Sequence, residues 1–126
     1  MPDELSLTAN DIALLRASNQ EFLDKVGAIL AESTYFEAEP TPEETRSYAR
    51  DWLVRQYKAL RTYLCSEEVL TKVAAVSPLD ATQILLDIMV AAVTAQHKLL
   101  VSSMVLLKFT AMFCVREGLS LLCESK

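Results

Sequence analysis

Glycine and proline are scarce in this chain, with two and four copies in 126 residues. Tight turns depend on these residues, so a fold built from many β-hairpins is poorly supported. Two glycines also leave no room for the glycine-rich loops that hold phosphate groups in nucleotide-binding proteins. The shortage of both residues therefore favours a helical chain.

Histidine and cysteine are scarce as well. There is one histidine, His97, and the three cysteines (Cys65, Cys114 and Cys123) form no Cys-x-x-Cys pair. This odd count argues against a disulfide framework and a zinc site, and it favours a reducing compartment. No cysteine stands in a pattern typical of a nucleophile, and a single histidine fills many roles besides catalysis. We expect no catalytic residue, no metal site and no cofactor, and we predict that the chain is not an enzyme.

The chain is acidic, with a formal charge of −5. This charge favours solubility and disfavours general binding to nucleic acid. The first residues, MPDELSLTAND, are acidic and lack the apolar run of a secretory signal. We therefore expect a cytoplasmic protein that does not bind nucleic acid.

Helix starts are marked by hydroxyl residues followed by acids or proline, and apolar residues then recur with helical spacing. We predict a single all-α domain over residues 1–126, a bundle of four to five helices with up-down packing. The N-terminal signals are Thr8, Thr41, Ser66 and Ser77. The expected helices cover about 9–33, 42–65, 67–76, 79–97 and 100–123.

Residues 78–123 are the most apolar part of the chain, with no proline after Pro78 and no glycine before Gly118. A helix that is apolar nearly all round is buried in a protein core, in an oligomer interface or in lipid. One helix over 79–123 would span roughly 65 Å, twice the diameter of a compact domain of this size. We therefore favour two helices that meet between residues 97 and 100, with one continuous helix as the alternative.

Lys108 bears on whether this apolar stretch is buried in protein or lies in lipid. Residues 99–115 approach the shortest length that crosses a membrane, but Lys108 lies near the middle of this stretch. In a folded domain we expect its ammonium group to reach water or a carboxylate. Membrane contact is the alternative, together with a bundle that binds an apolar ligand in its core.

The segment 42–65 carries an unusual surface, because five basic residues fall between positions 46 and 61 and alternate with aromatic ones. Tyrosine, tryptophan and arginine dominate the energetic centres of protein interfaces. We predict that a partner binds there, with Trp52 standing toward the core as an anchor. The predicted partner-binding residues are Arg50, Trp52, Tyr57 and Arg61. The competing interpretation is that the acidic first helix covers these charges within one chain.

These observations favour a non-enzymatic module that binds protein and forms an obligate homo-oligomer, most simply a homodimer through residues 79–123. An adaptor, an assembly chaperone, an inhibitor and a regulatory subunit all fit this description. The identity of the partner does not follow from the residues.

Overall fold

The computed structural model describes residues 7–32, 39–95 and 104–124, and within these ranges the chain is all-helical with no strand. The predicted all-α class is confirmed, but seven helices replace the four to five expected. They are α1 (Ala9–Arg16), α2 (Asn19–Ala31), α3 (Pro42–Leu64), α4 (Glu67–Ala74), α5 (Pro78–Ala95), α6 (Met104–Glu117) and α7 (Leu119–Glu124).

The predicted N-terminal signals all form. At α3 the Thr41 side chain accepts from the Glu44 backbone N–H (3.1 Å), and Glu44 accepts in return from the Thr41 N–H (3.2 Å). Thr8 and Asp11 make the same reciprocal pair at α1, and Ser66 caps α4. Ser77 accepts from the Asp80 N–H at the start of α5. Each cap satisfies a backbone donor that lacks a partner inside its helix.

The single helix expected over 9–33 is wrong, because the chain turns between α1 and α2. Ser18 caps α2 by accepting from the Glu21 N–H at 3.1 Å. The guanidinium of Arg116 in α6 closes the corner, with Nη1 donating to the carbonyls of Leu14 (2.7 Å) and Leu15 (3.1 Å). Ser18 and Glu21 have the spacing of a capping box, so a sequence signal for this break was present.

The apolar stretch after Pro78 forms α5, α6 and α7. The predicted boundary between residues 97 and 100 lies outside the described residues, as does His97. A second break, which we did not predict, falls at Gly118, whose φ of +90° favours glycine. One straight helix over 79–123 is excluded, because Leu85 in α5 and Cys114 in α6 belong to the same packed cluster.

Helix α6 is the centre of the molecule and contributes to two apolar clusters. One joins α6 to α2 and the first half of α3 through residues such as Phe22, Leu53 and Phe109. The other joins it to α4, α5, α7 and the second half of α3. Every residue from 106 to 114 is buried. The all-round apolar character of this segment therefore reflects burial in a protein core.

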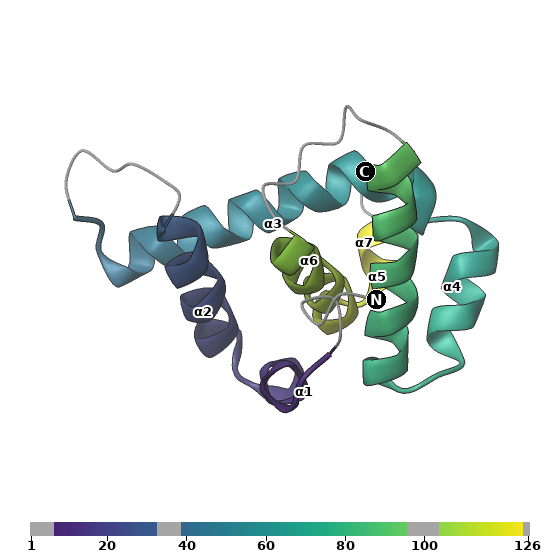
Figure 1. Cartoon of the computed structure of the whole chain (residues 1–126), viewed down its shortest axis with the longest axis horizontal. Coiled ribbons are helices and arrows are strands. Elements are labelled where there is room, and N and C mark those ends of the chain that lie inside the picture. Colours follow the sequence, from purple (N-terminus) through teal and green to yellow (C-terminus); the bar gives the residue numbers. More distant parts are fainter. Residues whose placement is uncertain (1–6, 33–38, 96–103, 125–126) are drawn as a thin grey trace.

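Helix α3 runs along the long dimension of the molecule and connects its two ends (Figure 1). Helix α2 packs beside its first half, whereas α4 and α5 stand at its other end, so α3 crosses its neighbours. The simple up-down packing that we expected is not the arrangement seen. The crossing leaves one side of α5 without a covering helix among the described elements, and this shapes the surfaces considered next.

Candidate interaction surfaces

The four residues predicted to bind a partner are largely engaged within the chain. Arg50 donates to the Glu117 carboxylate and its guanidinium lies 5.7 Å from the centre of the Phe113 ring. Arg61 donates to the carbonyl of Cys123 at 3.1 Å. Both arginines therefore connect α3 to the C-terminal helices.

Tyr57 was expected on the partner surface, but it is only 5% exposed. Burial raises the pKa of its hydroxyl, and the nearby Arg61 partly opposes that shift. Trp52 is half-buried against the cluster of α2 and α6, as its expected role of core anchor requires. The four residues thus do not form one exposed surface.

The part of α3 that does face solvent carries a shallow hollow of about 470 Å³. Arg55 and Lys58 are exposed there, and the ion pairs of the described residues use neither of them. The competing interpretation holds in part, because Arg46 on this helix pairs with Asp24 of α2 at 3.0 Å. We call this hollow the α3 surface, and it is lined by Tyr48, Asp51, Val54, Arg55 and Lys58.

A second hollow, of about 450 Å³, lies where α4 and α5 meet the end of α3. Its apolar lining includes Ile84 and Ile88, which are only half-buried. Lys72 and Asp87 bring charges of opposite sign to its rim. We call it the α4–α5 surface, lined by Tyr63, Glu68, Val69, Lys72, Ile84, Asp87 and Ile88.

Helix α5 is strongly apolar, and several of its large apolar residues, such as Ile84 and Ile88, are only partly buried. It has a mean hydropathy of 1.4, yet only a third of its residues are buried. It is also the helix, among those described, that is long and apolar enough to cross a membrane by length and composition alone. Core helices of globular proteins pass the same test, so this property by itself assigns no location.

In the segment 99–115, which the sequence offered as a membrane-spanning alternative, residues 106–114 are buried inside the protein. Lys108 in its middle is 7% exposed, and its Nζ lies 3.0 Å from the Asp11 carboxylate in α1. The expectation that this ammonium reaches a carboxylate is confirmed. Both charges are held inside the bundle as a partnered pair.

A third hollow, of about 230 Å³, lies between α4, the start of α5 and the turn from α6 into α7. Its lining is mostly apolar, and the two large hydrophobic residues that are most exposed, Val76 and Leu121, both border it. Leu121 is 67% exposed. Helix α7 forms one wall of this groove, so the groove depends on how α7 is held.

Cys65 and Cys123 form a disulfide, which corrects the inference from the odd cysteine count that disulfide bonding is poorly supported. The bond connects the end of α3 to α7 across 58 residues of sequence. Cys114 is the free cysteine and is buried. The odd number of cysteines concealed this pair, because spacing alone does not show which two of three cysteines come together.

Within the described ranges, no group of three or more His, Cys, Asp or Glu side chains is arranged to hold a metal ion. The residues that the structure brings together are instead apolar side chains bordered by charges. An apolar centre bordered by charged side chains is the arrangement typical of a protein interface. No protein-family model, no curated protein and no solved structure matches the chain.

Proposed function

We propose that this chain is a non-enzymatic, cytoplasmic helical module that acts by binding protein, and that it associates with a second copy of itself through α5. The observation that carries the proposal is the partial burial of α5. Only a third of this helix, which has a mean hydropathy of 1.4, is buried, and its apolar residues Ile84, Ile88, Val90 and Val93 are only partly buried within one chain. Excess apolar surface of this kind is what an obligate oligomer covers.

The α4–α5 surface fits a second copy because it carries both signs of charge around an apolar centre. A two-fold interface places the same patch on both chains, so a residue on one chain faces a different residue on the other. Lys72 of one copy can then face Asp87 of its partner, and the reverse contact follows by symmetry. Ile84 and Ile88 supply the apolar centre that such an interface needs.

The α3 surface is the better place for a different protein partner. The predicted residues Arg50 and Arg61 are occupied within the chain, whereas Arg55 and Lys58 face solvent beside Tyr48. We propose that an acidic partner segment binds here. In this proposal Arg50, Trp52, Tyr57 and Arg61 hold α3 against the rest of the bundle. A role as an adaptor, chaperone, inhibitor or regulatory subunit is compatible with both surfaces.

Light scattering on the purified chain tests self-association. The wild type is expected to have twice the mass of one chain in plain buffer. Replacing exposed Ala91, one turn beyond Asp87 on α5, with arginine is expected to give monomers. Arg55→Glu is the matched control and should leave the dimer intact. A monomeric wild type at high concentration would refute the proposal.

The second candidate is membrane contact through the same helix, because α5 meets the length and composition of a membrane span. Membrane contact predicts a different result in the light-scattering experiment. The wild type would aggregate in plain buffer, and mild detergent would disperse it. A discrete dimer that detergent does not change supports self-association instead.

A further inference from the structure

Helix α7 is the shortest of the described helices and packs against the bundle along one side. It has six residues, too few to be helical on its own. Leu119 is buried and Leu122 packs against both apolar clusters, whereas Ser120, Leu121 and Glu124 are exposed. Among the described side chains, Arg61 makes the hydrogen bond that reaches α7, at the carbonyl of Cys123.

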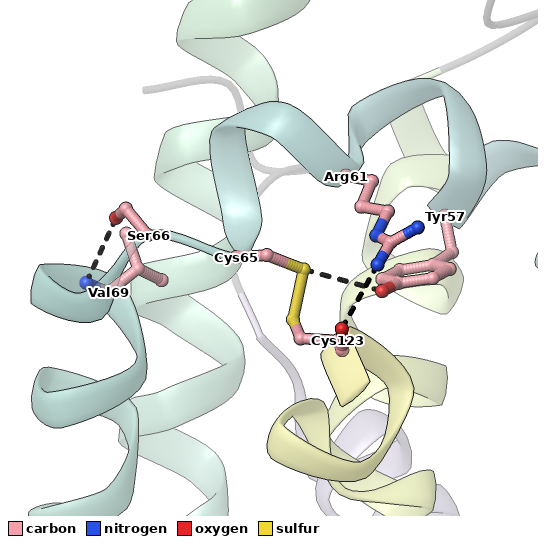
Figure 2. Close-up of a disulfide and its surroundings, with 6 residues drawn as sticks. All are labelled: Tyr57, Arg61, Cys65, Ser66, Val69 and Cys123. Carbon is pink, nitrogen blue, oxygen red and sulfur yellow. Dashed lines mark hydrogen bonds between the residues drawn. A yellow bond between two sulfur atoms is a disulfide. The ribbon is translucent and has the colours of Figure 1, made fainter. Parts of the chain in front are cut away.

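The disulfide is the covalent part of this attachment. Cys65 follows α3 directly, and Cys123 is the penultimate residue of α7 (Figure 2). The bond therefore holds the far end of α7 against the corner between α3 and α4. The near end of α7 is Gly118, whose φ of +90° gives the chain a natural pivot between α6 and α7.

The surroundings of the disulfide favour its reduction as well as its formation. Both cysteines are only half-buried, so the bond does not lie in the fully buried core. Figure 2 shows Arg61 and Tyr57 beside the bond, and the Tyr57 hydroxyl lies 3.3 Å from Cys65 Sγ. A guanidinium and a hydroxyl beside a sulfur atom stabilise the thiolate that leaves when the bond is broken.

We propose that the Cys65–Cys123 disulfide is a redox latch that keeps α7 closed over the bundle and releases it on reduction. A thiolate of a small dithiol attacks one sulfur and displaces the other cysteine as a thiolate, forming a mixed disulfide. The second thiol of the reagent then attacks the mixed disulfide. The two cysteines gain two electrons and two protons, and the dithiol becomes a cyclic disulfide.

Release of α7 uncovers part of the apolar interior. Leu119 belongs to the same packed cluster as Leu64, Leu86 and Cys114. The groove between α4, α5 and α7 loses the wall that Leu119 and Leu121 form. Reduction therefore turns a closed end of the bundle into an open apolar surface. This inference does not depend on self-association through α5.

Cys114 reports the state of the latch. It is fully buried, and its carbonyl accepts from the Gly118 N–H at the end of α6. In the oxidised protein we expect Cys114 to resist alkylation. After treatment with dithiothreitol we expect its alkylation to accelerate by at least about tenfold, because release of α7 is a local opening. Amide hydrogen exchange over 119–124 should accelerate in parallel, while exchange over 22–30 in α2 stays unchanged.

The variant Cys65→Ser/Cys123→Ser provides the control, since it should behave as the reduced protein with or without dithiothreitol. Three results would overturn the proposal. One is a purified protein with three alkylatable thiols after denaturation without reductant. Another is equal protection of Cys114 and of 119–124 in both redox states. The last is loss of protection in α2 together with α7, since that is global unfolding.

Discussion

Lys108 Nζ lies 3.0 Å from Asp11 Oδ2, joining two residues 97 positions apart in the sequence. The side chains are 8% and 10% exposed, so the pair lies inside the bundle. Asp11 also accepts from the Thr8 N–H at 2.8 Å as part of the α1 cap. The Asp11 carboxylate thus caps the start of α1 and also pairs with Lys108 in α6.

Replacing Lys108 with methionine is expected to lower the free energy of unfolding by about 3 to 5 kcal/mol, because it leaves a buried carboxylate without its cation. Urea unfolding followed by circular dichroism measures the change. The double variant Asp11→Asn/Lys108→Met should regain at least half of the loss, since the remaining side chain is uncharged. Equal losses in the single and double variants would show that the two charges are not coupled.

Gly27 marks a close approach of α2 to α3, since a Cβ at this position would lie 2.6 Å from Thr45 Cγ2. Glycine to alanine inside a helix normally stabilises by about 1 kcal/mol. Here we expect Gly27→Ala to destabilise by about 1 to 3 kcal/mol through overpacking. Thr45→Ser removes Cγ2 but keeps the hydroxyl, so adding it to Gly27→Ala should recover stability. A stable Gly27→Ala single variant would contradict this packing.

Burial raises the pKa of the Cys114 thiol to about 12 from an ordinary value of 9.0. Between these values the unfolded chain loses the thiol proton and the folded chain keeps it. The thiol's contribution to the free energy of unfolding is therefore full below pH 9 and declines as pH rises toward 12.

At pH 10 this loss amounts to roughly 1 kcal/mol relative to pH 8. Urea unfolding of the wild type and of Cys114→Ala at both pH values measures it. The stability of the wild type should fall more between pH 8 and pH 10 than that of the variant. Parallel declines in the two proteins would show that Cys114 does not titrate in this way.

The basic residues of α3 should separate into two groups by their effect on stability. Arg50→Glu/Arg61→Glu removes the contacts with Glu117 and with the Cys123 carbonyl, so we expect a clear fall in melting temperature. Arg55→Glu/Lys58→Glu makes the same charge change at exposed positions and should leave the melting temperature nearly unchanged. Differential scanning calorimetry compares the two pairs. Equal shifts would mean that the internal contacts of Arg50 and Arg61 contribute nothing.

The helix starts were predictable because they depend on residues close together in the sequence. The long-range contacts were not predictable. Thr41 with Glu44 and Ser77 with Asp80 are each three residues apart, so their caps can be read along the chain. Leu53, Leu60 and Leu64 follow helical spacing and are buried. The missed break at Ser18 also had a local signal, which the continuous apolar pattern masked.

The disulfide forms because the folded chain brings α7 back against the end of α3. The internal contacts of Arg50 and Arg61 form for the same reason, since their partners lie at the end of α6 and in α7. Cys65 and Cys123 are 58 residues apart, and Arg50 meets Glu117 across 67 residues. No local pattern specifies such contacts. Tyr57 was misplaced for the same reason, since its burial comes from helices that follow much later in the chain.

The central claim is that two copies meet through the α4–α5 surface, and light scattering on a charge-swap series tests it most directly. Lys72→Asp and Asp87→Lys each place like charges opposite one another in the proposed two-fold interface, so each alone should shift the protein to monomer. The double variant Lys72→Asp/Asp87→Lys restores opposite charges and should return the mass to that of two chains. Both positions are exposed, and the pair that Lys72 makes with Glu68 within its own chain is a weak surface pair, so folding should be unaffected. A mass that is the same for the wild type, both single variants and the double variant would contradict the account.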